Sequence, residues 1–169
     1  MNVELIGYHG TSKDKAKSIT RMKFFNKSTK NNEWLGHGIY FYELFEKAEW
    51  WSKNRYKNND CVLESKIIVD KSHYCNLDIP EKEDELYNFI KELEENGNYD
   101  YLFRGDTNKC RCDLFNLYST YKDIHVLGAT LLSTNKKGKN ELSNFGYQRT
   151  EKQYCVYNED CIRDINVMG

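Results

Sequence analysis

Apolar residues recur along the chain with two different spacings, which predict its secondary structure. Helical spacing, with charged residues on the remaining positions, predicts helices over residues 14–22, 43–56 and within 81–98. Ser12 is a suitable N-cap for the first of these, and Gly97 is a stop signal for the third. Alternating or continuous apolar runs predict strands over residues 3–9, 38–42, 62–69, 127–132, 147–149 and 153–157.

In this prediction the helices are concentrated early in the chain and the strands late. Such an order does not suit a parallel sheet built from alternating βαβ units. We therefore expect an α+β fold, in which helices pack on a twisted, mixed or mostly antiparallel sheet that is split in two. The 169 residues contain no repeat and no linker, and we expect one domain over residues 1–169.

Composition excludes several classes of protein. Aromatic residues make up 14% of the chain and only one proline occurs, which excludes disordered and collagen-like chains. The net charge of -1 gives no global attraction to nucleic acid or anionic lipid, so any such partner must be argued from a site. No apolar run approaches the ~20 residues that span a bilayer, and the first residues do not resemble a secretory signal. We expect a cytoplasmic protein with no membrane partner.

Six cysteines occur, at positions 61, 75, 110, 112, 155 and 161. A chain of this size does not need disulfides to stabilise its core, so reduced thiols, some buried as small apolar groups, are expected. Cys110 and Cys112 are too close in sequence for the usual zinc knuckle. We expect no structural metal.

Two segments combine glycine with side chains that can line a cleft. Residues 7–12 place His9 beside Gly10 where the predicted strand ends in a turn, so that the imidazole can point into a cleft while the glycine backbone approaches a ligand. Residues 34–41 place two glycines before a strand, which indicates a tight turn or bulge that directs Tyr40 sideways. A structural histidine, and a hairpin turn beside a core aromatic, explain the same residues.

Two further segments carry aromatic and polar groups at regular spacing. Trp51 follows Tyr40 on the next helix, so the two rings can sandwich a flat ring, worth ~1 kcal/mol beyond burial. Glu151 and Gln153 alternate on a strand and therefore share one face, where a carboxylate and an amide suit ribose hydroxyls. Aromatic core packing and a solvated polar face are the respective alternatives.

Jointly and in this order, these motifs resemble the ADP-ribosyltransferases of the poly(ADP-ribose) polymerase and diphtheria-toxin branch. The motif order of that branch is His-Gly-[Ser/Thr], then Gly-x-Gly-Ile-Tyr-Phe, then a strand-borne Glu near the C-terminus. His9-Gly10-Thr11 and residues 36–41 match the first two motifs, and Gln153 aligns with the Glu. The resemblance spans residues 9–157, of which 70–125 match only in general layout.

The resemblance implies an NAD-dependent ADP-ribosyltransferase, a glycosyltransferase that moves ADP-ribose from NAD, its substrate, to a nucleic-acid or protein target and releases nicotinamide. It implies that His9 holds the adenosine-side ribose and that Gly10 binds the carboxamide through its backbone. Tyr40 and Trp51 would stack on the nicotinamide. The other NAD-binding residues that it implies are Thr11, Gly38 and Ser28, the last in the loop 24–28.

Because residue 153 is Gln, the identity of the catalytic carboxylate is open. Either Glu151 and Gln153 work as a Glu-x-Gln motif, or Gln153 marks an inactivated enzyme, or it is an introduced replacement of Glu. An amide can hold a ribose hydroxyl but cannot act as a general base, a role worth about 10²–10⁴ in rate. We therefore assign catalysis to His9, Tyr40, Glu151 and Gln153, with Glu151 as the carboxylate. The alternative is a catalytically silent module that binds NAD or ADP-ribose.

The acceptor is expected at the loop before the third motif, over residues 133–140 and the segment that follows. Basic residues interleaved with aromatics suit a nucleic-acid strand, although a solvated turn explains them equally and a protein acceptor remains open. The residues concerned are Lys136, Lys137, Lys139, Tyr147 and Arg149. By analogy, the size of the chain fits a bacterial or phage toxin or defence effector, with an antitoxin protein as a further partner.

Overall fold

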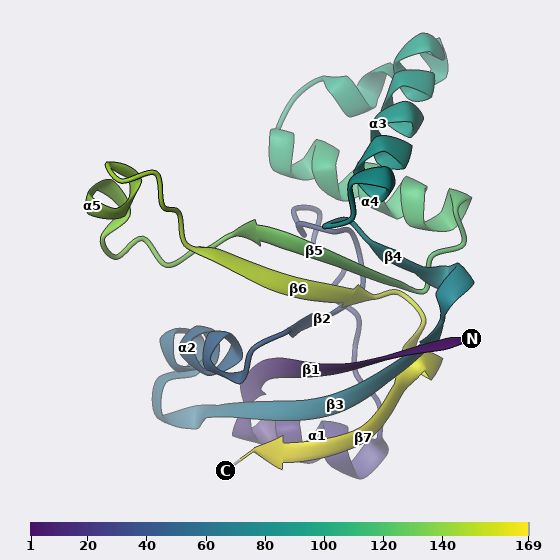
Figure 1. Ribbon diagram of the computed structural model, residues 1–169. Coiled ribbons are helices and arrows are strands. Elements are labelled where there is room, and N and C mark those ends of the chain that lie inside the picture. The colour runs from purple at the N-terminus through teal and green to yellow at the C-terminus, as the bar shows by residue number, and fades with distance from the viewer. Residues whose placement is uncertain (169) are drawn as a thin grey trace.

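The computed structural model describes residues 1–168, which form an α+β fold of helices packed on one sheet (Figure 1). Within these residues the strands lie in the order β4-β5-β6-β2-β1-β3-β7. Their bounds are β1 (Asn2–Ser12), β2 (Ile39–Tyr42), β3 (Asp60–Asp70), β4 (Tyr74–Asn76), β5 (Val126–Leu132), β6 (Thr150–Val156) and β7 (Ile162–Met168). Only β4 and β5 pair in parallel, so the prediction of a mostly antiparallel sheet is confirmed.

The helices are α1 (Lys13–Met22), α2 (Phe45–Tyr56), α3 (Pro80–Glu95), α4 (Thr107–Tyr121) and the short α5 (Lys139–Ser143). The three helices predicted from the sequence are therefore present. Ser12 caps α1 by accepting a hydrogen bond of 3.3 Å from the backbone N–H of Lys15, as predicted. No helix within residues 1–168 is long and apolar enough to cross a membrane.

The sheet has two halves that meet at a narrow junction. β1 and β2 pair only at Tyr8 and Tyr42, whereas β1 pairs with β3 along its whole length. We expected a sheet split in two. The structure instead has one continuous sheet, which is narrowed at the junction between β1 and β2. Figure 1 shows α3 and α4 beside the half that contains β4 and β5, and α1 beside the half that contains β3 and β7.

Two clusters of buried apolar residues hold the helices on these halves. One joins α3 and α4 to β5 and β6, through Phe89, Leu93, Phe115, Tyr118, Leu127 and Cys155. The other joins α1 to β2 and β3 through Ala16, Phe25, Phe41, Leu63 and Ile67, and Val3 and Leu5 of β1 pack against it. The six cysteines are free thiols, and Cys75, Cys112, Cys155 and Cys161 are buried, as expected of small apolar side chains.

Two strand predictions are wrong in detail. The first strand does not end in a turn at His9, because β3 pairs with β1 as far as Ser12. Residues 147–149 form a loop instead of a strand. Gly146 before them has a φ of 75°, and the N–H of Tyr147 bonds back to the carbonyl of Leu142, which turns the chain away from the sheet.

The predicted order of early helices and late strands is also wrong. The sequence prediction missed α4, which occupies the middle of the chain, and the strands β4 and β7. The buried face of α4 includes Cys112 and Ser119 beside Phe115 and Tyr118, so its apolar periodicity is weak.

Candidate functional site

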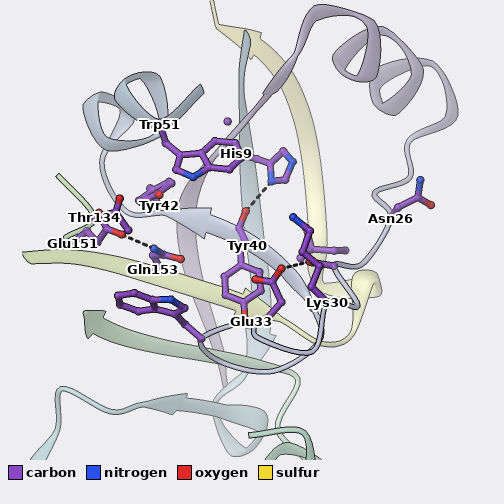
Figure 2. Close-up of a pocket in the computed structure, with 15 residues that line it drawn as sticks. His9, Asn26, Lys30, Glu33, Tyr40, Tyr42, Trp51, Thr134, Glu151 and Gln153 are labelled. Carbon is purple, nitrogen blue, oxygen red and sulfur yellow. Dashed lines mark hydrogen bonds between the residues drawn. The ribbon is translucent and has the colours of Figure 1, made fainter. Parts of the chain in front are cut away.

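A cleft of about 280 Å³ lies where β1, β2 and the start of β6 come together (Figure 2). The loop between α1 and β2, Trp51 of α2 and Thr134 of the loop after β5 complete its walls. This volume is near the lower end of the ~300–1,000 Å³ of small-molecule sites, so a larger ligand would extend from it into solvent. The junction between the two halves of the sheet therefore provides the cleft.

Most residues predicted for the site line this cleft. They are His9, Gly10, Ser28, Gly38, Tyr40, Trp51, Glu151 and Gln153. Thr11 does not line it and is buried with 2% of its surface exposed. The five residues predicted to meet the acceptor do not line it either.

The aromatic walls of the cleft come from β2 and α2. The two-residue period of β2 buries Ile39 and Phe41 on one face and places Tyr40 and Tyr42 on the other, and both tyrosines line the cleft. Figure 2 shows Trp51 of α2 and the ring of Tyr40 on different sides of the cleft. The arrangement can hold a flat ring between an indole and a phenol.

Hydrogen bonds at the end of the Tyr40 side chain fix its ring. Its hydroxyl donates to the carbonyl of Gly36 at 2.6 Å and accepts from the N–H of Leu35 at 2.9 Å. Burial raises the pKa of Tyr40 far above its ordinary value, so the phenol stays neutral. Gly36 adopts a φ of 85°, which favours glycine, and this turn brings the two backbone groups to the hydroxyl.

His9 lies beside Tyr40 as a neutral imidazole. Its Nδ1 lies 2.7 Å from the carbonyl oxygen of Tyr40, which can only accept, so Nδ1 carries the proton and Nε2 the lone pair. Burial lowers the pKa of His9, because the charged form loses its hydration. The ring packs edge-on against Phe25, with a centroid distance of 5.1 Å.

Glu151 and Gln153 lie side by side on β6, on one face as their spacing predicts. Gln153 Nε2 donates to Glu151 Oε1 at 2.8 Å. Burial raises the pKa of Glu151, against the opposing effects of hydrogen bonds from Gln153 and Ser133 and of the charge of Lys47. A buried carboxyl group with a raised pKa, in a cleft, is typical of an acid or base.

The sequence prediction missed polar and aromatic residues that also line the cleft. Asn26, Lys30, Glu33 and Trp34 come from the loop before β2, Tyr42 from β2 itself and Thr134 from the loop after β5. Ser28 holds this first loop in place: its backbone pairs with Gly38 at 2.8 and 3.2 Å, and its hydroxyl donates to the Glu33 carboxylate. Of the missed residues, only Tyr42 had a signal in the sequence, since it alternates with Tyr40.

The loop predicted to meet the acceptor begins at the cleft and leads away from it. Figure 1 shows the segment with α5 projecting beyond the ends of β5 and β6. Phe145 at its tip is 92% exposed, and Tyr147 is also exposed. Arg149 Nε donates to the carbonyl of Lys137 at 3.0 Å, which ties the two ends of the segment together.

Comparison with known proteins does not show the family of this chain. No protein-family model matches the chain. The chain is 35% identical over 81 residues to an uncharacterized protein of Methanocaldococcus jannaschii, over 44% of this chain and 38% of that protein. The chain thus spans less than half the length of this relative.

Proposed function

We propose that the chain is an NAD-dependent ADP-ribosyltransferase that transfers ADP-ribose to a macromolecular acceptor and releases nicotinamide. The observation that carries this proposal is the meeting of two flat aromatic walls, Trp51 and Tyr40, with a buried carboxylate, Glu151, in one cleft. The first two can hold the nicotinamide ring, and the third supplies negative charge beside it. The sequence resemblance to this class of enzyme supports the same assignment.

Gly10 explains how Trp51 reaches the cleft. A Cβ on residue 10 would lie 2.8 Å from the carbonyl oxygen of Ala48 and 3.1 Å from Trp51 Cε3. Only glycine therefore allows α2 to approach β1 this closely without a shift. In the proposed complex the nicotinamide ring lies against Trp51 and Tyr40, with its amide toward the backbone of Gly10.

The proposed reaction breaks the glycosidic bond between the ribose C1′ and the nicotinamide nitrogen. The electron pair of that bond goes to the nitrogen, which neutralises the pyridinium, and positive charge develops on the ribose. The Glu151 carboxylate stabilises this charge and accepts the proton that the acceptor hydroxyl or amine loses as it bonds to C1′. Gln153, bound to Glu151, presents its amide oxygen to the ribose hydroxyls.

A second candidate function is a silent module that binds NAD or ADP-ribose without cleaving the bond. The observation in its favour is the amide of Gln153, which stands where the family that the sequence resembles has a carboxylate. This amide also donates a hydrogen bond to one oxygen of Glu151. In this alternative, Glu151 serves only to hold Gln153 and the ribose.

Nicotinamide release from NAD separates the two functions. The assay uses the chain alone and with RNA, DNA or cell lysate. It compares the chain with three variants: Glu151→Gln, Gln153→Glu and, as a control, Glu94→Gln, which changes an exposed carboxylate on α3. A transferase releases nicotinamide. Glu151→Gln should lower the rate of release by a factor of about 10²–10⁴, whereas Glu94→Gln should keep the parental rate.

Each other result has its own meaning. Release only by Gln153→Glu would show that position 153 carries the catalytic residue and that the Glu151–Gln153 pair is silent. No release by any variant, with NAD still raising the melting temperature, would support the binding module. No release and no effect of NAD on melting would overturn both functions.

A further inference from the structure

Two imidazoles and a carboxylate meet at the opposite end of β5 from the cleft. His73 closes a short 3-10 helix (Lys71–His73) directly before β4, and His125 lies directly before β5. Since β4 and β5 pair in parallel from Tyr74 and Val126 onward, the two histidines occupy neighbouring positions on one edge. Their rings stack with a centroid distance of 4.0 Å and an interplanar angle of 4°.

Asp123 completes the cluster from the turn between α4 and β5. It adopts a φ of 51°, a left-handed conformation that aspartate tolerates better than most residues. Its Oδ2 lies 3.4 Å from His73 Nδ1, and its Oδ1 lies 3.4 Å from His125 Nε2. One donor atom from each of the three residues lies within 4.8 Å of the others.

These separations suit a metal ion better than direct hydrogen bonds. A hydrogen bond from an imidazole to an oxygen is about 2.7–3.2 Å long, so both 3.4 Å contacts exceed it. Two ligands at about 2.0–2.1 Å from a tetrahedral Zn²⁺ ion lie roughly 3.3–3.4 Å apart. The carboxylate therefore lies about one metal-bridged distance from each ring.

We propose that His73, Asp123 and His125 form a binding site for a divalent transition-metal ion of the Zn²⁺ type. Imidazole nitrogen with one carboxylate selects such an ion over Mg²⁺ and Ca²⁺, which take oxygen ligands. Water fills the remaining coordination position. The site is separate from the cleft, so it holds whether or not the proposed transferase activity does.

To share an ion, the two imidazoles must turn out of their parallel stack, because a metal ion lies in the plane of each ring that it binds. Their partial exposure leaves room for this rotation. The exposed fractions of the His73, Asp123 and His125 side chains are 32%, 74% and 29%, so solvent reaches all of them. His73 Nδ1 donates to the carbonyl of Asp123 at 2.8 Å. An ion that binds at Nδ1 takes the place of this proton, and the ring then carries its proton on Nε2. The backbone of His125 stays fixed, since its N–H bonds to His73 and its carbonyl accepts from Tyr157.

Cobalt provides a direct test on the full chain, reduced throughout, with Co²⁺ as the only added metal. We expect one Co²⁺ per chain, visible d–d absorption of nitrogen and oxygen donors, no thiolate charge-transfer band, and displacement by Zn²⁺. His73→Gln and His125→Gln should each weaken the affinity at least tenfold.

A matched pair of aspartates controls for charge and folding. Asp123→Asn should weaken Co²⁺ binding several-fold, because asparagine keeps the left-handed conformation but loses the anionic ligand. Asp164→Asn changes an exposed aspartate that also has a φ of 51°, and should bind as the parent does. If circular dichroism shows that a histidine variant does not fold, the Co²⁺ affinities of Asp123→Asn and Asp164→Asn test the proposal instead. The proposal is overturned by a lack of saturable binding, by a thiolate spectrum, or by equal affinities of the two aspartate variants.

Discussion

Gln153 donates a hydrogen bond of 2.8 Å to the carboxylate of Glu151, and the two side chains hold each other inside the cleft. Glu151 is 4% exposed, so few other donors reach it. Burial disfavours its charged form, whereas the amide N–H of Gln153 favours it. The residue at position 153 therefore influences how readily Glu151 ionises.

Replacing that donor with a second carboxylate reverses its effect. In Gln153→Glu, two acidic groups face each other where a hydrogen bond now forms, so the pKa of the pair rises and one proton is shared between them. We expect the variant to lose roughly 1–3 kcal/mol of unfolding free energy near neutral pH and to approach the parent in acid. Urea denaturation from about pH 4 to pH 8 measures this, and equal stability at the upper limit would contradict it.

Glu151 itself makes the stability of the protein depend on pH. Its pKa is raised by burial, so in the unfolded chain it ionises at a lower pH than in the folded protein. Below the unfolded pKa of about 4.3 both states are protonated and the group costs nothing. As the pH rises from the unfolded pKa through the folded pKa, the free energy of unfolding falls, and above the folded pKa the full cost of burying the charge is present.

Glu151→Gln removes this cost while keeping an oxygen that accepts from Gln153. We expect the variant to be more stable than the parent at neutral pH and to match it in acid. Urea denaturation of both proteins across the same pH range measures the difference. A stability gain that is equally large at low pH would show that titration of Glu151 is not its cause.

Local patterns in the sequence predicted those parts of the site that lie on strands. The alternation along 150–156 places Glu151 and Gln153 on one face, and the turn at 36–38 leads into the strand that carries Tyr40. The aromatic spacing likewise placed Trp51 on the helix that covers the cleft. These relationships depend only on residues close in sequence, so one chain reveals them.

Contacts between distant segments were not predictable in the same way. Glu33 reaches the cleft because Ser28 pairs with Gly38, and no periodicity marks that loop. His73 and His125 meet only because β4 pairs in parallel with β5, and β4 is a three-residue strand without a pattern. The two histidines lie far apart in the sequence and belong to no common motif, so only the pairing of these strands brings them together.

Two adjacent tryptophans on α2 test the aromatic wall. Trp51 lines the cleft, whereas Trp50 does not and is 37% exposed. Ring stacking contributes about 0.5–1.5 kcal/mol beyond burial, and the lost contact area adds to it. We expect Trp51→Ala to weaken NAD binding at least tenfold and Trp50→Ala to leave it within twofold, as measured by calorimetry. Similar losses in both variants would place the ligand away from this wall.

Tyr40→Phe separates the two roles of this residue, the packing of its ring and the hydrogen bonds of its hydroxyl. Phenylalanine keeps the ring but leaves the buried N–H of Leu35 and the carbonyl of Gly36 without their partner. Each buried group left unpaired costs about 1–3 kcal/mol, so the unfolding free energy should fall by about 1–3 kcal/mol or more. Tyr87→Phe, at a position that is 61% exposed, should not change it.

The same variant should bind NAD almost as well as the parent, because the surface that faces the ligand is still an aromatic ring. A large loss of stability with affinity retained within a few-fold would show that the hydroxyl serves the turn and the ring serves the ligand. If Tyr40→Phe instead loses NAD affinity while its stability stays at the parental level, the hydroxyl contacts the ligand directly, and the hydrogen bonds to Leu35 and Gly36 are not what fixes the ring.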